Sequence, residues 1–264
     1  MLFKKKEAEE MTEREDGLTD YDVYIMSKPE KAINIILAAA VLFAVGYIFY
    51  HNYFLSAILM LFAVKWPKIR TGQIIKKRKN QLTLQFKDML YSLASALSVG
   101  KSVESGIQDA LKDLRVIYPD PQTDILLELE YILRGIGMNN TVESMFSQFA
   151  ERAHLEDIEN FVDIFVTCKR SGGDLIEVMR STSHTIGEKI EVKQEIETTI
   201  SGKKYEFRLM MLLPVIMVLF LTLTSGDYMK TVFTTAEGRI AMTAAIVIFG
   251  VSYVAGTKVM EINV

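Results

Sequence analysis

The stretch with the strongest claim to chemistry is CKRSGGDL, residues 168–175, in which a basic pair and a serine precede two glycines and an acid. Glycine-rich loops can hold phosphate through backbone N–H groups. A Walker loop requires G-x-x-x-x-G-K-[ST] between a strand and a helix, and a dinucleotide loop requires G-x-G-x-x-G after a strand. This stretch has neither spacing and follows no strand pattern. We therefore predict a turn between two helices and no nucleotide site.

Each residue of this stretch suits such a turn. Lys169 and Arg170 favour the C-terminus of a helix, and a glycine can take the left-handed conformation that closes one. Asp174 can cap the following helix, with Glu177 as its reciprocal partner three residues later. The expected role of the stretch is geometric.

Other side chains that could do chemistry are few and scattered. His51, His154 and His184 lie far apart and beside no cluster of acids and cysteines, so neither a metal site nor acid–base catalysis is expected. Cys168 lies on an apolar helical stripe and is predicted to be a small core residue. The hydrolase, zinc-protease and kinase signatures are missing. We expect a protein that is not an enzyme and that uses no cofactor or metal.

Three uncharged tracts indicate a membrane protein: Ala32–Val64, Leu209–Ser225 and Ile240–Thr257. A spanning helix needs about 20 apolar residues. The first tract is too long for one simple span and suits a tight hairpin that turns at His51–Tyr53. Its second half, Phe54–Trp66, is short. We therefore expect four spans, with three spans as the alternative.

The basic residues predict the orientation of these spans. They concentrate between Lys65 and Lys79, and again just before the second tract, whereas the loop 226–239 has only Lys230 and Arg239. The positive-inside rule then predicts a multi-pass membrane protein with both termini and the middle of the chain in the cytoplasm. Five residues are candidates for anchoring to membrane lipids at the interface: Trp66, Lys76, Lys77, Arg78 and Lys79.

The middle of the chain is predicted to be helical. Phe86, Met89, Leu90 and Leu93 recur at three and four residues, and Gly100 ends that helix. The expected fold is all-α, a cytoplasmic bundle of about six helices between two transmembrane helical hairpins. The expected boundaries are 1–30 for an acidic N-terminal arm, 31–66 for the first hairpin, 67–80 for a basic juxtamembrane segment, 81–205 for the cytoplasmic domain, 206–260 for the second hairpin with an external loop at 226–239, and 261–264 for a C-terminal tail.

The last helix of this domain is expected to be long. No proline occurs between Asp174 and Leu213, so one helix can run from Asp174 to Thr224, roughly 76 Å at 1.5 Å per residue. Such a helix would join the domain to the third span and carry motion between them. The positions expected to shape the turns and this coupling are Gly100, Gly172, Gly173, Asp174, Glu177, Gly202 and Pro214.

Charge limits the possible partners. Residues 82–205 contain 13 basic and 20 acidic side chains, a net charge of −7. This sign disfavours nucleic acid. Five acids form either an ordinary solvated helix face or a docking surface for a basic partner: Glu151, Glu156, Asp157, Glu159 and Asp163. Residues 1–27 are polar and acid-rich and are predicted to form a disordered or marginal arm, either a solvated tail or a docking tail.

Two segments carry a resemblance to a known family. FKDMLYSLASALSVGKSVESGIQDAL, residues 86–111, resembles the first helix pair of the type II secretion F-type domain. FVTCKRSGGDL and the long helix after it, residues 165–216, resemble the second signature of that family. The similarity extends from about Gln81 to Leu223, and the order of domain and spans is most similar to Tad/Flp pilus assembly membrane proteins. One departure is the basic pair before the glycines, where the family usually has an acid.

The resemblance implies a non-enzymatic inner-membrane platform of a pilus or secretion machine. It implies contact with a hexameric secretion ATPase, transfer of pilin subunits from the bilayer, and pairing with itself or with a related platform protein. Two readings from other classes stay open. One is a membrane-anchored scaffold or sensor that binds a cytoplasmic regulator, and the other is a transporter subunit, which the uncharged spans disfavour.

Overall fold

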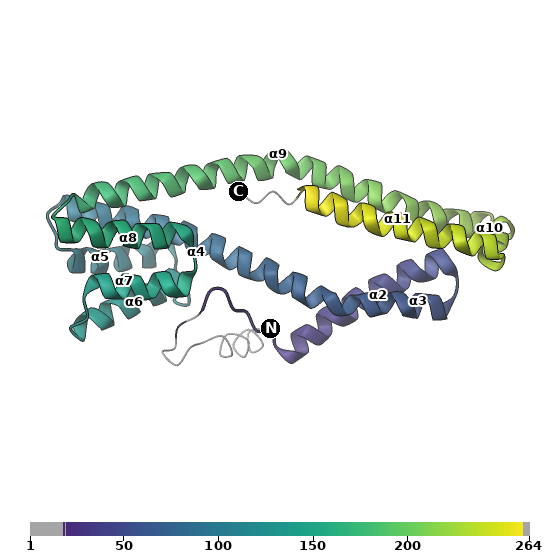
Figure 1. The fold of residues 1–264 in the computed structure, drawn as a ribbon, viewed down its shortest axis with the longest axis horizontal. Helices are drawn as coiled ribbons and strands as arrows, with labels where there is room; N and C mark the ends of the chain where they lie inside the picture. The colour runs from purple at the N-terminus through teal and green to yellow at the C-terminus, as the bar shows by residue number, and fades with distance from the viewer. Residues whose placement is uncertain (1–17, 19, 261–264) are drawn as a thin grey trace. The chain divides into compact units, whose positions relative to one another are not determined.

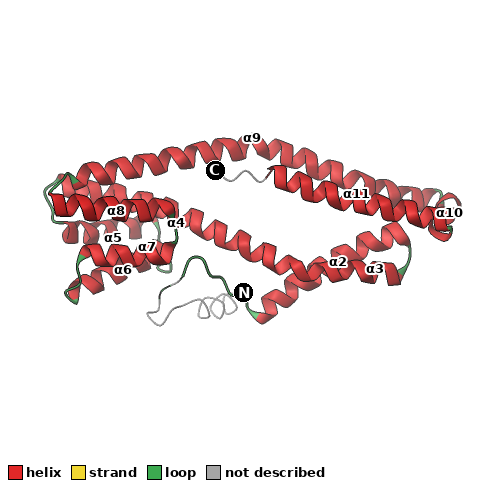
Figure 2. Ribbon diagram, in the orientation of Figure 1, coloured by secondary structure: helices red, strands yellow, loops and turns green. Residues whose placement is uncertain are grey.

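The computed structural model describes Leu18 and residues 20–260, and this part of the chain is helical with no strand (Figure 2). The expected all-α fold is confirmed. The chain divides into two compact units, each considered separately. The first, here called the helical domain, contains Arg70–Val192 and the described residues up to Ser27. The second, here called the apolar unit, contains Lys28–Ile69 and the described residues after Val192.

The helical domain is a bundle of antiparallel neighbours in which α5 packs on α6, α6 on α7 and α7 on α8. The helices begin where the sequence supplies caps. Ser102 accepts a hydrogen bond from the N–H of Ser105, and Thr141 accepts one from the N–H of Ser144. The bounds are α4 Trp66–Ser98, α5 Val103–Ile117, α6 Asp124–Gly137, α7 Val142–Ala153, α8 Glu156–Ser171 and α9 Leu175–Thr224.

Aromatic side chains from three helices form the centre of this domain. Phe86 of α4 lies against Phe161 of α8, with ring centroids 5.4 Å apart and the rings edge to face. Phe146 of α7 packs in the same way against Phe161 at 5.8 Å and Phe165 at 5.2 Å. All of these rings are buried. Burial of such large apolar surfaces is the main stabilising contribution to the bundle.

The apolar unit contains two packed pairs of helices. In the first, α2 (Lys28–Tyr50) packs against α3 (Tyr53–Met60) and the 3₁₀ helix η1 (Leu61–Lys65). The chain turns at His51, whose φ is +48°, and the Asn52 side chain caps α3, so the predicted turn is confirmed. In the second pair, α11 (Ala236–Met260) follows α10 (Gly226–Thr234) and runs back along α9 (Figure 1), where the rings of Phe207 and Tyr253 lie 6.3 Å apart.

Three helices in the described part of the chain are long and apolar enough to cross a membrane: α2, α9 and α11. None of the apolar stretch of α9 or α11 is buried within the protein. No helix at the position of the expected fourth span meets this criterion, because α3 has eight residues and η1 has five, whereas a spanning helix needs about 17. The helical path nevertheless continues from α3 through η1 into α4, since Leu61 and Trp66 both have right-handed helical backbone angles.

Several expected boundaries differ from the structure. Residues 67–80 are part of α4, and the expected limits of the domain at 81 and 205 fall inside α4 and α9. The expected loop 226–239 consists largely of α10 and the first turn of α11. Helix continues through 67–80 because Pro67 lies in the first turn of α4, where a proline is tolerated, whereas Ser225 and Thr235 separate α9, α10 and α11.

The described part of the expected N-terminal arm is not a solvated tail. Leu18 and Tyr21 are buried, and Tyr21 packs in the core of the helical domain, so in these residues the structure favours the docking tail over the solvated tail. Although the arm is acid-rich, the free energy gained by burying its apolar side chains favours a bound conformation over a solvated one. Residues 1–17, which include most of the expected acidic arm, lie outside the described residues.

Candidate coupling element and interaction surfaces

The stretch CKRSGGDL forms the turn between α8 and α9, as predicted. Gly172 ends α8 with a φ of +72°, the left-handed region that side chains other than glycine rarely adopt. Gly173 then donates its N–H to the Cys168 carbonyl at 2.9 Å. Gly100 closes α4 in the same way, with a φ of +87°.

The second glycine is required for a different reason. A Cβ at Gly173 would lie 2.8 Å from the Sγ of Cys168, a separation that real Cβ atoms essentially never show. Gly172 has open space around it and is constrained only by its backbone angle. The two adjacent glycines therefore meet separate constraints, one conformational and one steric.

Asp174 begins the long helix. Its Oδ1 accepts hydrogen bonds from the N–H groups of Ile176, at 2.9 Å, and Glu177, at 3.2 Å, so the structure shows the Asp174 half of the predicted capping box. The helix that follows has 50 residues without a break, which confirms the predicted long helix. Gly202 is exposed within it, and Pro214 lies inside it without ending it.

The basic pair has a structural partner. Lys169 Nζ contacts a carboxylate oxygen of Glu143, in the first turn of α7, at 2.9 Å. Burial tends to raise the pKa of Glu143, but its own backbone N–H and Lys169 outweigh that effect and leave the pKa below its ordinary value. Lys169 thus joins the end of α8 to the start of α7.

The predicted acidic surface lies mostly in solvent. Glu151 on α7 and Glu156, Glu159 and Asp163 on α8 are exposed. Asp157 differs, because it is half-buried and forms an ion pair with Lys189 of α9. Four of the five acids are therefore open to a partner, and the fifth attaches α9 to the domain.

The structure separates the predicted membrane anchors into two groups. Trp66 and Lys77 are exposed, as an anchoring role requires. Arg78 instead pairs with Asp124 of α6, at 3.1 Å, and Lys79 contacts Asp22 and donates a hydrogen bond to the His154 carbonyl. The interpretation of Arg78 and Lys79 as lipid anchors is replaced, because the helical domain holds both side chains. Lys76 is also exposed.

A buried ion pair was not predicted. Glu128 of α6 and Arg152 of α7 have side-chain exposures of 0% and 3%, and Arg152 Nε and Nη2 lie 3.3 and 2.5 Å from the two carboxylate oxygens. The Tyr131 ring covers the guanidinium, 4.9 Å from its centroid to Cζ. Burial raises the pKa of Glu128, against the opposing hydrogen bonds from Arg152 and Tyr21. The sequence did contain one indication of this pair, because Glu128 lies among the apolar residues of α6 that are buried.

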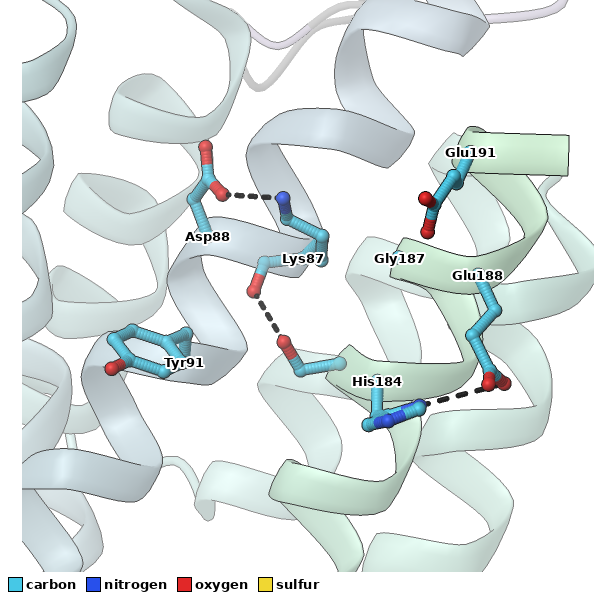
Figure 3. A pocket seen from close by; sticks show the side chains of 8 residues that line it. Lys87, Asp88, Tyr91, His184, Gly187, Glu188 and Glu191 are labelled. Atoms are coloured by element: carbon cyan, nitrogen blue, oxygen red, sulfur yellow. Dashed lines mark hydrogen bonds and ion pairs between the residues drawn. The ribbon is translucent and has the colours of Figure 1, made fainter. Parts of the chain in front are cut away.

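A shallow groove of about 470 Å³ lies between α4 and α9 within the helical domain (Figure 3). Its polar groups largely satisfy one another. The Asp88 carboxylate contacts Lys87 and accepts a hydrogen bond from the Tyr118 hydroxyl at 2.6 Å, and His184 pairs with Glu188 at 3.4 Å. Tyr91 at the edge is 73% exposed. The groove offers a surface and no arranged set of reacting groups.

No group of three or more His, Cys, Asp or Glu side chains placed to hold a metal ion occurs among the described residues. His51 and His154 both lie in turns, each with a φ of +48°, and Cys168 is a half-buried free thiol.

Comparison with known proteins gives one match. Residues 89–223, just over half of the chain, match the family model described as type II secretion system (T2SS), protein F. The matched region begins within α4, includes α5 to α8, and ends one residue before the end of α9. No curated protein and no solved structure matches the chain.

We predict that Gly173→Ala destabilises the helical domain by about 1–3 kcal/mol, because the new methyl group collides with Cys168 Sγ. Cys168→Ala in the same chain should relieve most of this loss. Gly172→Ala should cost about 1–2 kcal/mol through its backbone angle, and Cys168→Ala should not relieve that loss. Thermal unfolding of the four variants measures these effects. If Cys168→Ala restored the stability of both glycine variants to the same extent, the two glycines would not meet separate constraints.

Proposed function

Because the chain belongs to the type II secretion system protein F family, we propose that it couples a cytoplasmic secretion ATPase to filament assembly in a Tad/Flp-like pilus or a type II secretion machine. Members of this family are inner-membrane platform proteins and are not enzymes. In the proposal, a separate hexameric ATPase hydrolyses ATP, and the apolar unit collects pilin subunits from the bilayer. The order of a single helical domain between two apolar helix pairs favours the Tad/Flp variety.

The observation that carries this proposal is the continuity of α9. The helix begins at the glycine turn, where Met179, Ser183 and Ile186 are buried in the helical domain. It continues without a break to Thr224, through a stretch whose apolar side chains are exposed. A continuous helix can transmit rotation or displacement along its axis, because each backbone hydrogen bond links successive turns. A movement imposed on the helical domain can therefore reach the bilayer.

The acidic surface is the proposed docking site of the ATPase. Glu156, Glu159 and Asp163 are exposed on one helix and Glu151 on the next, and complementary charge raises association rates and selects partners. Pairing with a second copy or a related platform protein would bring several such surfaces to one hexameric partner.

The path of the first apolar tract supports two crossings of the membrane. Tyr21 and Arg78 precede and follow this tract in the sequence and contact each other in the helical domain. The chain between them must therefore leave the domain and return to it. We infer that α2 crosses the membrane and that α3, η1 and the start of α4 return, with the helical domain and both termini in the cytoplasm. The short second arm would require local thinning of the bilayer or use of the first turns of α4.

We expect the ATPase to co-purify with the wild-type protein and to be lost on charge reversal of the acidic surface. Glu156→Lys with Glu159→Lys and Asp163→Lys should lower retention roughly tenfold or more at low salt, since several complementary charges become repulsive. Glu191→Lys with Glu195→Lys and Glu197→Lys, at three exposed positions on α9, is the matched control. Retention of a regulator without an ATPase would favour the scaffold or sensor alternative. Undiminished ATPase retention by the triple variant would exclude this docking surface.

We also expect single cysteines in a Cys168→Ser background to report the topology. Asn52→Cys, at the first turn, and Glu237→Cys, at the start of α11, should react with a membrane-impermeant maleimide added to intact cells. Ser201→Cys, exposed on α9, should react only after lysis and is the control. Labelling of Asn52→Cys only after lysis would show that the first tract does not cross as a hairpin.

A further inference from the structure

A short segment before α2 is bound to the helical domain. This segment, here called the strap, consists of Leu18 and residues 20–27, and it leads directly into α2 at Lys28. Leu18 and Tyr21 are 5% and 2% exposed, although the strap has no helix of its own. The strap lies outside the region that matches the protein F family model. Its binding is therefore a feature of this chain that the family match does not describe.

Tyr21 occupies a pocket formed by three helices. Its hydroxyl donates a hydrogen bond to Glu128 of α6 at 3.2 Å, and its backbone N–H donates one to the Arg152 carbonyl of α7 at 3.1 Å. The Arg78 guanidinium of α4 covers its ring, 5.2 Å from Cζ to the ring centroid. Burial, followed by the negative charge of Glu128, raises the pKa of Tyr21 well above its ordinary value, which keeps the hydroxyl a donor.

The residues on either side of Tyr21 are both acidic, and each meets a basic group. The Asp20 carboxylate lies 3.5 Å from His154 Nε2, and Asp22 contacts the Lys79 ammonium group. The sequence Asp-Tyr-Asp is thus matched by a pocket for the aromatic ring with basic side chains at its rim. This is a binding site for a short acidic segment with a central tyrosine.

The pocket does not need the strap to balance its charges. Glu128 and Arg152 contact each other through both carboxylate oxygens, so they stay paired when the tyrosine hydroxyl leaves. The ion pair between Asp22 and Lys79 at the rim is partly exposed, and salt screens ion pairs of that kind. The strap therefore keeps its buried contacts in salt, and among these Tyr21 is the side chain that contacts Glu128 of α6 and the Arg78 guanidinium of α4. Short segments held in this way open locally while the rest of the domain stays folded.

We propose that Asp20-Tyr21-Asp22 is a releasable latch that ties the start of α2 to the helical domain. Seven residues lead from Tyr21 to Lys28, so a closed latch holds the start of α2 within about 25 Å of the pocket, at 3.3–3.6 Å per residue. An open latch removes this limit, and the chain then connects α2 to the domain by the longer path through α3, η1 and α4. The latch operates whether or not an ATPase or a pilin binds. Its test is therefore independent of the proposed function.

Hydrogen exchange of the full chain in lipid nanodiscs, followed by mass spectrometry, tests the latch. Tyr21→Ala should raise the exchange rate of strap amides at least tenfold and leave α6 and α7 unchanged. Tyr21→Phe, which keeps the ring and loses the hydroxyl, should give an intermediate rate. Tyr91→Ala, at an exposed tyrosine of α4, is the control and should change nothing in the strap. Unchanged strap exchange in Tyr21→Ala, or faster exchange throughout α6 and α7, would overturn the proposal.

Two measurements on the wild-type protein need no variant. Raising NaCl from 0.05 M to 0.5 M should speed strap exchange several-fold and change exchange in α6 and α7 far less, because salt screens the rim contact whereas a buried apolar core holds those two helices. Strap exchange that does not respond to salt would show that the acidic flanks do not hold the latch.

Protection of the strap should also be independent of protein concentration. Protection that falls on dilution would place the strap of a second copy in the pocket and overturn a latch within one chain.

Discussion

The mechanical properties of this protein depend on how the helical domain holds one end of α9. Met179, Ser183 and Ile186 are the buried residues of that helix, and the Ser183 hydroxyl donates a hydrogen bond to the Lys87 carbonyl of α4 at 3.2 Å. Lys189, one turn further along, pairs with Asp157 of α8. Beyond Lys189 no residue of α9 is fully buried. The domain therefore fixes α9 over its first turns, and the backbone hydrogen bonds of the helix carry that constraint onward.

The glycine turn sets the direction in which α9 leaves the bundle. Gly172 supplies a backbone conformation and Gly173 supplies the space next to Cys168, so α8 and α9 approach closely at the turn. Lys169 joins the same turn to α7 through Glu143. These contacts give residues 168–175 a structural role at the turn between α8 and α9.

The features predictable from sequence are those that depend on neighbouring residues. The turn at 168–175, the start of α9 at a capping acid and the helical periodicity of α4 follow from local rules of backbone conformation and from the spacing of apolar residues. The acidic face of α8 was predictable for the same reason. The split of the first tract into α3 and η1 was not, because composition does not distinguish an α-helix from a short 3₁₀ segment.

The features that escaped prediction depend on residues far apart in the chain. Glu128 and Arg152 are 24 residues apart, and Tyr21 reaches Glu128 across 107 residues. From sequence alone, the acidic segment around Tyr21 is predicted to be a tail. The pocket that binds Tyr21 forms only when the helical domain folds. Arg78 and Lys79 read as lipid anchors for the same reason, since their partners Asp124 and Asp22 are distant in sequence.

The central claim is that α9 must be continuous for the helical domain to act on the membrane. Thr199 is exposed in the middle of α9, outside its buried turns, so Thr199→Pro removes a backbone hydrogen bond and kinks or breaks the helix there, at a cost of about 3 kcal/mol, without removing a buried packing contact. Thr199→Ala is the matched control. The direct measurement is filament assembly or substrate export by cells that carry each variant at equal membrane levels. We predict full activity for Thr199→Ala and loss of assembly for Thr199→Pro with the ATPase still bound. Normal assembly by Thr199→Pro would contradict the account.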